Sequence, residues 1–479
     1  MLILRALETF QTTYGDRRVI VSRAPGRINL LGNHIDHRGG YLNYVGISRD
    51  TIMVASRNDD DTVRIVNTNA DRFHPAEFSI GDLLPPDKRG NWHEFIEHVE
   101  ITTRSWENYI RAPILYLQDQ HQDQTIAGMD IAVAGDVPIA AGLSSSSTLV
   151  VSTFLAASHF NNVAIPKDEQ AEFCGAAEWY AGTRGGSGDH AAMLYAKPQA
   201  LLHLRFFPLV TEELPFPAGF RVVACNSLVE HAPPGIFNER IASYEIGLML
   251  IKQANPDIAE KLEHLRDLNP ATTGKSVSEI YAMLRDVPVR ASREQIRALL
   301  PDSGSRLDTL FSPHPEPSEG YRLRQVVMFG IAECARSARG GELLKADDLE
   351  GFGALKKRSH DGDRQFNTSR DRDPDPVDNR ISDEDLNRLI ETAPPFDQQT
   401  GGYDCSCEEL DRLTDIASAV EGCVGAGLTG GGLGGCVLAI VREDAVDALV
   451  AAVNDAFYKP RGLQDDTLVC SSAAGACIV

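Results

Sequence analysis

The feature that most constrains the fold is a glycine-rich stretch between two apolar runs near the end of the chain. Residues 427–436 read GLTGGGLGGC and contain six glycines. The runs Gly422–Ala426 and Cys436–Val441 on either side have the composition of strands. Glycine at this density loses much backbone entropy when the chain folds. The stretch is therefore either a slack linker or a loop that another group approaches closely, and the rest of the chain decides between the two.

A second loop, DVPIAAGLSSSSTLVV at 136–151, joins a predicted strand at Met129–Ala134 to a predicted helix at Thr148–Phe160. Its four consecutive serines, Ser144–Ser147, exceed what capping a helix requires. Free amides at a helix N-terminus, with extra hydroxyls and Gly142 before them, form a site for an anion. Hydroxyls there can also ligate Mg²⁺ between phosphate oxygens. The alternative is an ordinary capped helix that follows a turn.

This loop is not a Walker P-loop. The Gly-Lys-Ser tripeptide at 274–276 has Asn269 where that motif needs its first glycine. The tripeptide instead predicts the start of a helix, and any phosphate site in the chain is of another kind.

A third loop is expected near the N-terminus, at Ser22–Asn43, where the sequence reads SRAPGRINLLGNHIDHRGGYLN. It combines glycines with the hydrogen-bonding side chains of Arg27, Asn33, His34, Asp36, His37 and Arg38. A tight loop of this kind suits a polyhydroxylated ligand, which needs many fixed donors and acceptors. A metal site built from the two histidines and Asp36 is the alternative.

The stretch AEWYAGTRGGSGDHAAM at 177–193 leaves a predicted helix, Asp168–Ala181, through several glycines. It presents Glu178 on the helix and Asp189 beyond the turn. Taken singly, Glu178 reads as a surface acid and Asp189 as a helix cap. The two acids become functional candidates only in combination with the other loops.

The composition is that of a globular protein, with 43% hydrophobic and 24% charged residues. The formal net charge of −22 argues against a nucleic-acid or anionic-membrane surface. A phosphate ligand stays possible, because local amides and one or two cations suffice. Nine cysteines without disulfide-like spacing indicate a reducing compartment, so we expect a cytoplasmic protein. Cys405 and Cys407 have no second pair at zinc-like spacing, and we see neither a signal peptide nor a run of membrane-spanning length.

We expect two domains, an α/β N-terminal domain at 1–214 and an α+β C-terminal domain at 215–479. In the second domain, a helix-rich part follows a strand at Phe220–Asn226. An acidic insertion is expected near 361–400. Its segment Asp361–Asp378, DGDRQFNTSRDRDPDPVD, is highly charged with few apolar residues, which predicts a mobile surface insertion.

Taken together, these stretches resemble the GHMP kinase superfamily and, within it, the galactokinase family. APGRINLLGNHIDHRGG is similar to the galactokinase signature, and VPIAAGLSSSS resembles the phosphate-binding motif of the superfamily. GTRGGSGD resembles the segment with the catalytic aspartate, and LTGGGLGGC the C-terminal glycine motif. The segments SWENYI, CNSLVEH, FNER and YDCSCEELD also look like family segments, and all occur in the family's order. AEWYAGTRGG and CSCEELD look most similar to the N-acetylgalactosamine kinase branch.

The resemblance implies an N-terminal half like ribosomal protein S5 domain 2 and a ferredoxin-like C-terminal half, with the active site between them. It implies transfer of the γ-phosphoryl group of MgATP to the anomeric hydroxyl of a galactose-type sugar. It also implies that the glycine-rich stretch at 427–436 packs beside the serine-rich loop and the sugar. The glycines then serve close approach, which disfavours the linker.

The resemblance also implies a role for individual residues. Asp189 matches the catalytic aspartate, and Arg27 matches the arginine that would keep it ionised and stabilise charge on the phosphoryl group. The sugar contacts implied are Asn33, His34, Asp36, Gly186, Phe237 and Asp189. The ATP contacts implied are Trp106, Gly142, Leu143, Ser144, Ser145, Ser146, Ser147, Gly431 and Gly432. Glu178 and one serine, for which we favour Ser146, match the Mg²⁺ ligands; Trp106 reads equally well as a core aromatic.

The chain departs from most galactokinases at Asn33, where they have glutamate facing the C6 hydroxyl of the sugar. A glutamate about 4 Å from a C6 carboxylate would cost roughly 4 kcal/mol at an effective dielectric near 20, so asparagine allows a uronic acid. HIDHRGG is also similar to plant galacturonokinases, and Arg38 is the cation expected to pair with the carboxylate. Phe237 replaces a tyrosine of many relatives. Gly188 and His190 flank Asp189 where methionine and glutamine are usual, which loosens the packing around the base.

We therefore expect an ATP-dependent sugar 1-kinase acting on galactose, as a monomer without nucleic-acid or membrane partners. Galacturonate and N-acetylgalactosamine are the alternative substrates. A non-catalytic galactose and ATP sensor on the same fold is the alternative of another class. Because Arg27, Glu178, the serine run and Asp189 are all present, the sequence favours the enzyme.

Overall fold

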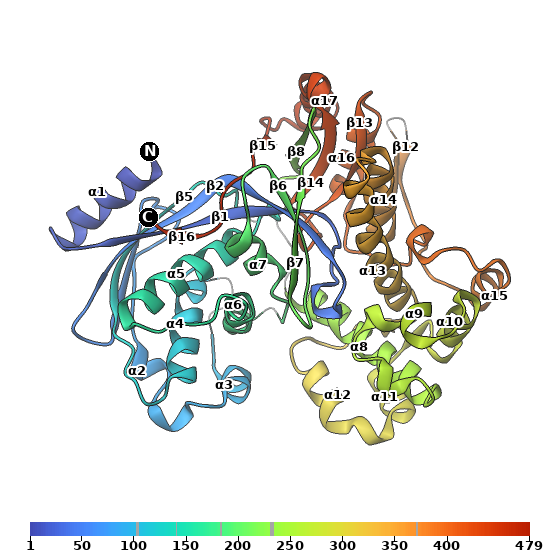
Figure 1. Ribbon diagram of the computed structural model, residues 1–479, viewed down its shortest axis with the longest axis horizontal. Coiled ribbons are helices and arrows are strands. Elements are labelled where there is room, and N and C mark those ends of the chain that lie inside the picture. Colours follow the sequence, from blue (N-terminus) through green and yellow to red (C-terminus); the bar gives the residue numbers. More distant parts are fainter. Residues whose placement is uncertain (102–104, 140, 183, 230–233, 370–371) are drawn as a thin grey trace.

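The computed structural model describes residues 1–101, 105–139, 141–182, 184–229, 234–369 and 372–479. In this part of the chain, two main β-sheets form, one in each half (Figure 1). The chain leaves the first sheet at Pro215, and the first strand of the second sheet begins at Phe220. The change of sheet thus falls where the sequence indicates a domain boundary.

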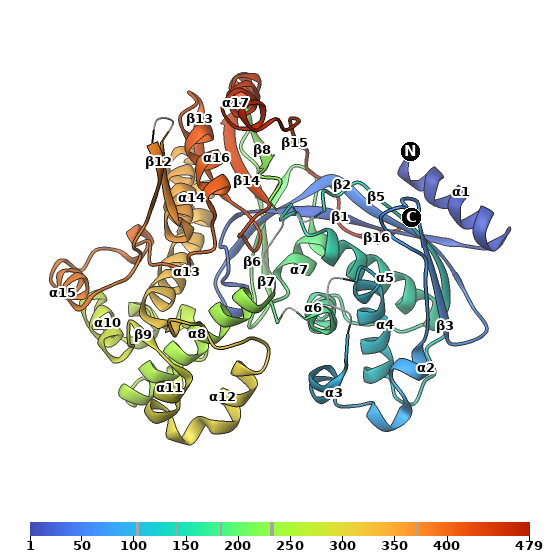
Figure 2. The ribbon, with the colours of Figure 1, turned by 180° about the vertical axis from the view of Figure 1, so that it is seen from behind.

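The N-terminal sheet has eight strands within the described residues. They are β1 (Ile20–Leu31), β2 (Leu42–Arg57), β3 (Thr62–Asn67), β4 (Ala76–Ser79), β5 (Met129–Gly135), β6 (Ala200–Arg205), β7 (Val210–Pro215) and β16 (Cys477–Ile478). Their order is β16-β1-β2-β5-β3-β4, and β6 pairs with β2 and β7. Because β16 pairs with β1, the end of the chain belongs to the N-terminal sheet (Figure 2). The division at residue 215 therefore does not hold for the last residues.

Helices cover both faces of this sheet. They are α1 (Leu2–Tyr14), α2 (Ile80–Leu83), α3 (Trp92–His98), α4 (Asn108–Gln120), α5 (Ser145–Asn161), α6 (Gln170–Glu178) and α7 (Gly188–Tyr195). Successive side chains of a strand point to opposite faces. Accordingly, Ile52 and Val54 of β2 pack with α1, whereas Met53 and Ala55 lie in the core formed with α4 and α5.

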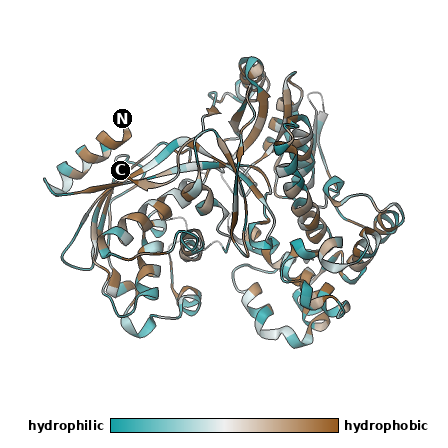
Figure 3. Ribbon diagram, viewed as in Figure 1, coloured by the Kyte–Doolittle hydropathy of each residue, from teal (hydrophilic) through white to brown (hydrophobic). Residues whose placement is uncertain are grey.

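The C-terminal sheet consists of β8 (Phe220–Asn226), β13 (Cys423–Leu428), β14 (Cys436–Arg442) and β15 (Thr467–Cys470), in the antiparallel order β13-β14-β8-β15. Val222 and Ala224 of β8 face a core with α14 (Leu349–Asp363). Val223 and Cys225 face α16 (Glu408–Ser418) and α17 (Val446–Val453). The strands β5 and β14 are hydrophobic and buried along almost their whole length, as expected for strands covered on both faces (Figure 3).

A helical part lies between β8 and β13 and has a core of its own. Its longer helices are α8 (Pro234–Ala254), α10 (Val277–Met283), α11 (Arg293–Leu299), α12 (Gly304–Phe311), α13 (Leu323–Lys345) and α15 (Asp383–Thr392). Short elements complete it: α9 (Pro270–Thr273), β9 (Arg290–Ala291) and β10 (Tyr321–Arg322). Ser276 caps α10 in a capping box, so the Gly-Lys-Ser tripeptide is a helix start, as the sequence predicts.

The prediction of one long loop at Ser22–Asn43 is wrong. Most of its first half belongs to β1, and a short 3-10 turn at Asp36–Arg38 precedes β2. The pairing of β1 with β2 is interrupted at Pro25/Gly26 and again after Asn29. Such bulges bend a strand and re-aim its side chains, so polar residues that look like a loop in sequence can lie on a strand.

The prediction of a mobile insertion at Asp361–Asp378 is also wrong, although residues 370 and 371 lie outside the described part. A hairpin of β11 (Phe366–Ser369) and β12 (Arg372–Pro376) forms here. The backbone amides of Gln365 and Phe366 donate to the Asp411 carboxylate of α16. Charged side chains thus fix this segment through polar contacts rather than through an apolar core, which composition alone does not reveal.

Across the segments that the structure describes, no helix has both the length and the apolar character needed to cross a bilayer.

Candidate active site

Arg27 and Asp189 lie together, although 162 positions separate them in the chain. Arg27 sits on β1 just after the first bulge, and Asp189 sits in the first turn of α7. The Arg27 guanidinium donates from Nε to Asp189 Oδ1 at 2.7 Å and from Nη2 to Oδ2 at 2.5 Å. The side chain of Arg27 is 5% exposed and that of Asp189 is 28% exposed. The pair is thus buried on the arginine side and open on the carboxylate side.

Two further donors reach the Asp189 carboxylate. Ser144 Oγ donates to Oδ2 at 2.5 Å, and the Tyr44 hydroxyl donates to Oδ1 at 3.2 Å. Burial raises the pKa of Asp189, but the charge of Arg27 and the hydrogen bonds from Arg27 and Ser144 outweigh it. The net pKa lies below the ordinary value for aspartate, so Asp189 is an ionised carboxylate at neutral pH.

Arg27 also fixes the serine-rich loop against this carboxylate. Its Nη1 donates to Gly142 O at 2.6 Å, and its backbone amide donates to Leu143 O at 3.3 Å. Ser144 is the residue before α5, has φ 59° and makes no side-chain cap. Its hydroxyl turns to Asp189 instead of capping the helix, which contradicts the reading of an ordinary capped helix. The amides at the start of α5 thus lie next to the Arg27–Asp189 pair, in a position that suits an anion.

The glycine-rich loop between β13 and β14 packs against the serine-rich loop. A Cβ on Gly430 would come within 2.9 Å of Gly142 O, and a Cβ on Gly142 within 2.8 Å of Thr429 O. Thr429 Oγ1 also exchanges hydrogen bonds with the backbone of Asn29 on β1. A Cβ on Gly432 would meet Cys405 O at 1.9 Å. These contacts answer the question raised by the glycines: the loop is a close-packed junction of three distant segments and not a linker.

Glu178, at the end of α6, has one carboxylate oxygen fixed by two neighbours. Ser147 Oγ donates to Oε2 at 2.8 Å, and His190 Nε2 lies 2.7 Å from the same atom. The other oxygen, Oε1, makes no hydrogen bond to the described residues. The hydroxyls of Ser145 and Ser146 likewise make none with this part of the chain. A carboxylate oxygen and two hydroxyls near a helix N-terminus fit the oxygen ligands that Mg²⁺ prefers.

Asp36 and Gly186 meet beside Asp189. A Cβ on Gly186 would lie 2.4 Å from Asp36 Oδ2, so only glycine allows this approach. The other oxygen, Oδ1, accepts hydrogen bonds from the amide and from Nδ1 of His37. Burial raises the pKa of Asp36, but the hydrogen bonds from His37 outweigh it and hold the pKa well below the ordinary value. Asp36 is therefore a second fixed anion near Asp189, able to accept hydrogen bonds from hydroxyls.

His34 packs against the C-terminal half. Its ring stacks on that of Tyr403 at 4.1 Å, and its Nε2 lies 3.4 Å from Asp363 Oδ1. The backbone of His34 has φ 64°, which few residues other than glycine adopt. His34 thus joins the signature segment to α14 and to the 402–405 segment.

Asn33 is 1% exposed, and both ends of its amide are engaged. Its Oδ1 accepts from Asn29, and its Nδ2 donates to Leu428 O at 3.2 Å. Lys356, which is also fully buried, donates to the same carbonyl at 2.6 Å. The cation next to Asn33 is therefore Lys356.

The expectation that Arg38 pairs with a substrate carboxylate is wrong. Arg38 is buried, and its guanidinium forms an ion pair with Glu245 of α8. Because Glu245 already neutralises Arg38, no free guanidinium is presented to a ligand.

Trp106 and Phe237 occupy different surroundings. Trp106 is half-buried against the N-terminal core, with its ring 5.5 Å from that of Phe73. This position fits a core aromatic, and its role toward adenine stays a prediction. Phe237 of α8 faces the glycine-rich loop, because a Cβ on Gly431 would lie 3.0 Å from its ring. Phe237 thus lies at the same junction of loops.

Sequence reasoning misses three residues that build the site. Tyr44 on β2 donates to Asp189, and Thr429 ties the glycine-rich loop to β1. Glu333 of α13 is fully buried and accepts from the amides of Gly32 and Asn33. Tyr44 is the first residue after the segment Ser22–Asn43 and gives a weak signal. Glu333 is 300 positions from Asn33 and gives none.

Three family models match the chain in order. The galactokinase galactose-binding signature matches residues 8–57. The GHMP kinases N terminal domain matches residues 108–197, and the GHMP kinases C terminal model matches residues 379–459. Arg27, Asn33, His34 and Asp36 lie within the first match. The second match contains the serine-rich loop, Glu178 and Asp189, and the third contains the glycine-rich loop.

Curated relatives and a solved structure match this chain over almost its whole length. The chain is 26% identical over 515 residues to galactokinase of Dictyostelium discoideum, covering 98% of this chain and 93% of that one. It is 27% identical over 473 residues to galactokinase of Chloroflexus aurantiacus, covering 98% and 96%. The fold matches the crystal structure of Lactococcus lactis galactokinase complexed with galactose, with a TM-score of 0.72, 22% identity and full coverage of both chains.

Proposed function

The chain belongs to the GHMP kinase superfamily and, within it, to the galactokinase family, and from this premise we propose that it is an ATP-dependent sugar 1-kinase whose substrate is galactose. The observation that carries the proposal is the convergence of Arg27 and Ser144 on Asp189, beside the glycine-rich loop. This arrangement offers an ionised carboxylate next to an anion site, which is what phosphoryl transfer to a hydroxyl requires.

In the reaction, the anomeric oxygen of the sugar forms a bond to the γ-phosphorus of ATP, and the bond from that phosphorus to the β,γ-bridging oxygen breaks. Asp189 accepts the proton that leaves the anomeric hydroxyl. To donate this proton, the sugar hydroxyl takes the place of the Ser144 hydroxyl, which donates a hydrogen bond to Asp189 Oδ2 in the structure. Arg27 keeps the carboxylate oriented and ionised, and it opposes the negative charge on the transferring group.

The serine-rich loop is proposed to bind the phosphates. The amides at the start of α5 are proposed to bind the phosphates, and Gly430, Gly431 and Gly432 belong to the loop that packs against Gly142. Magnesium, when bound, neutralises phosphate charge. Glu178 and Ser146 would hold it, with Ser147 and His190 fixing the orientation of Glu178.

Asp36, His34, Gly186 and Phe237 are proposed to line the sugar site. Asp36 accepts hydrogen bonds from neighbouring sugar hydroxyls, and the missing side chain of Gly186 allows Asp36 to approach this segment closely. An epimer that places a hydroxyl elsewhere leaves the buried carboxylate unpaired, at a cost of about 1–3 kcal/mol. This difference selects the galactose configuration.

A second candidate substrate is galacturonate, and the surroundings of Asn33 favour it. Asn33 carries no charge, and the ammonium of Lys356 shares the Leu428 carbonyl with it. A C6 carboxylate near the Asn33 side chain would therefore meet the Lys356 ammonium, while the Glu333 carboxylate binds the backbone amide of Asn33. Since both side chains are buried, one of the two bonds to Leu428 has to open to admit the carboxylate.

The compartment and the oligomeric state are proposals as well. All nine cysteines are free thiols, which a reducing compartment such as the cytoplasm maintains. We propose that the enzyme works there as a monomer.

An ADP-release assay tests the function. The purified protein is incubated with MgATP and, in separate reactions, galactose, N-acetylgalactosamine, galacturonate, glucuronate or L-arabinose. We expect the largest kcat/KM on galactose. Faster turnover of galacturonate would favour the second candidate, and sugar-dependent binding of ATP without ADP release would identify a sensor and contradict the proposal.

A further inference from the structure

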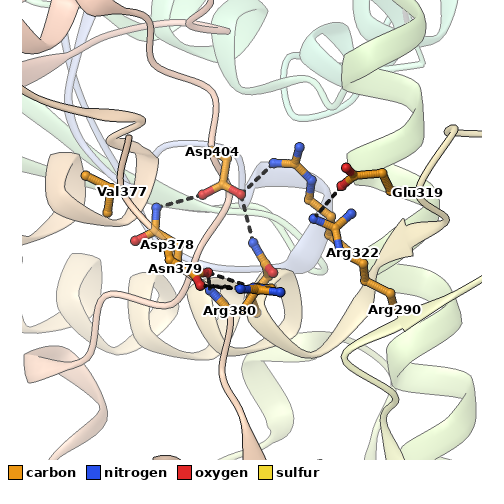
Figure 4. A pocket seen from close by; sticks show the side chains of 9 residues that line it. Arg290, Glu319, Arg322, Val377, Asp378, Asn379, Arg380 and Asp404 are labelled. Atoms are coloured by element: carbon orange, nitrogen blue, oxygen red, sulfur yellow. Dashed lines mark hydrogen bonds and ion pairs between the residues drawn. The ribbon is translucent and has the colours of Figure 1, made fainter. Parts of the chain in front are cut away.

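A polar cavity of about 510 Å³ lies in the C-terminal half, outside the site described above (Figure 4). Its walls come from the β9–β10 region, the start of α13, the 377–380 turn and Asp404. None of its lining residues belongs to the Arg27–Asp189 site. Its size is in the range of cavities that hold small-molecule ligands.

Three guanidinium groups line the cavity, and each contacts one carboxylate. Arg290 pairs with Glu319 at 3.1 Å, and Arg322 pairs with Asp404 at 2.6 Å. Arg380 pairs with Asp378, two residues away, at 2.6 Å. Arg290 and Arg380 thus line the same cavity, each with an acidic partner (Figure 4). Arginine has the geometry to bind phosphate or carboxylate groups with two parallel hydrogen bonds.

Two of these three carboxylates are easily displaced. The side chain of Glu319 is 72% exposed and that of Asp378 is 59% exposed. An exposed ion pair contributes only about 0–1 kcal/mol. An incoming anion can therefore replace these two partners while Glu319 and Asp378 turn into water. Asp404, whose side chain is 11% exposed, accepts from Arg322, Gln325 and Asn379 and stays in place.

One residue of the cavity wall has a buried acceptor without a donor. Gln325 is 2% exposed, and its Nε2 donates to Asp404. Its Oε1 is buried and has no hydrogen-bond partner among the described residues. Leaving a buried polar atom unpaired is costly, and a ligand hydroxyl would remove that cost. The cavity therefore suits a ligand that carries both an anionic group and a hydroxyl group.

We propose that this cavity is a second ligand site, and that it binds a phosphorylated sugar. The phosphate lies between Arg290 and Arg380 once Glu319 and Asp378 have turned into water, and a sugar hydroxyl donates to Gln325 Oε1. The site is separate from the catalytic one, so both can be occupied at once.

The wall of the cavity is continuous with the loops of the catalytic site. Asp404 has φ 56°, a strained conformation for a residue other than glycine. The preceding residue, Tyr403, stacks on His34, and the carbonyl of the next residue, Cys405, accepts from the amide of Leu433 in the glycine-rich loop at 2.6 Å. A ligand that touches Asp404 therefore acts on a segment that also supports the catalytic loops.

Isothermal titration calorimetry of the full chain tests the proposal. The catalytic site is first filled with galactose and a non-hydrolysable ATP analogue with Mg²⁺. Galactose 1-phosphate and glucose 6-phosphate are then titrated in separate runs, with inorganic phosphate and glucose as reference ligands. We expect one further site for at least one sugar phosphate, weaker binding of inorganic phosphate, and no binding of glucose.

Variants of residues that line the cavity test whether the measured heat of binding comes from this cavity. The double variant R290Q/R380Q should weaken the sugar phosphate at least tenfold, whereas Glu319→Gln should strengthen it because a competing carboxylate is removed. Turnover of galactose without added sugar phosphate reports that each variant is folded, since none of these residues lies in the catalytic site. The proposal is overturned if neither sugar phosphate binds below 5 mM, or if the affinity is the same in wild type, R290Q/R380Q and Glu319→Gln.

Discussion

Arg27 binds both carboxylate oxygens of Asp189, at 2.7 Å and 2.5 Å, from a strand that lies 162 positions earlier in the chain. The same guanidinium holds the carbonyl of Gly142. One side chain thus fixes the distance between the carboxylate and the loop at the start of α5. In the proposed reaction these two elements meet the sugar hydroxyl and the phosphate, so Arg27 sets the geometry between them.

Replacing Arg27 by glutamine should change the pH dependence of turnover. Asp189 works as the ionised form, and Arg27 lowers its pKa, so protonation of Asp189 should not limit the wild-type kcat/KM near neutral pH. Without the cation, burial raises the pKa of Asp189, and the acid limb of the profile moves to higher pH. Profiles of kcat/KM test this. A variant profile that is lower but parallel to that of the wild type would show that Arg27 does not control this ionisation.

Variants of the serine run should separate the proposed metal ligand from its neighbours. Ser146→Ala and Glu178→Gln should raise the Mg²⁺ concentration needed for half-maximal ATP binding, because each removes an oxygen ligand. Ser145→Ala serves as the matched control and should have a smaller effect. Calorimetric titration of ATP at several Mg²⁺ concentrations gives the result. If Ser147→Ala alone reproduced the effect of Glu178→Gln, then Ser147 would be the metal-binding serine.

Gly432→Ala should destabilise the protein more than a glycine substitution in open space. Gly432 has φ 77°, and a Cβ would lie 1.9 Å from a backbone carbonyl. Gly462 has φ 66° with nothing within 4 Å, so Gly462→Ala isolates the cost of the backbone conformation. We expect about 1–2 kcal/mol for Gly462→Ala and about 2–6 kcal/mol for Gly432→Ala, which adds overpacking to strain. Urea unfolding measures both, and equal losses would argue against the tight junction.

Lys356→Met should change how stability depends on pH. Burial lowers the pKa of Lys356 from 10.5 to about 8. Because the folded pKa lies below the unfolded one, the unfolded chain binds more protons between pH 8 and 10.5, and stability rises with pH there. The difference in unfolding free energy between wild type and Lys356→Met should therefore shift in favour of the wild type by about 2 kcal/mol from pH 7 to 9.5. A difference that is constant with pH would show that Lys356 keeps an ordinary pKa.

Much of the fold and the family follows from the sequence, because the informative segments are local. The serine run before α5 and the glycines between β13 and β14 lie where the sequence indicates. Their joining through Thr429 and Gly142 depends on tertiary packing that neither segment reveals alone.

Other parts could not be predicted, for definite reasons. Arg38 looks available in sequence, but Glu245, on a helix about 200 residues later, neutralises it. The charged stretch at 361–378 looks mobile, but the Asp411 carboxylate satisfies its backbone amides. Ser144 looks like a cap, but a positive φ turns its hydroxyl toward Asp189. In each case a polar contact between distant residues decides the outcome, and such contacts leave no local pattern.

The most direct test of the account is the turnover of Asp189→Asn, because asparagine preserves the size of the side chain and removes the proton acceptor. We expect kcat on the preferred sugar to fall at least about a hundredfold, while calorimetry shows nearly unchanged binding of a non-hydrolysable ATP analogue. Asp123→Asn, at an exposed aspartate in the loop after α4, is the control and should keep full activity. If Asp189→Asn retained more than a tenth of the wild-type kcat, Asp189 would not be the group that accepts the proton, and the proposed mechanism would be wrong.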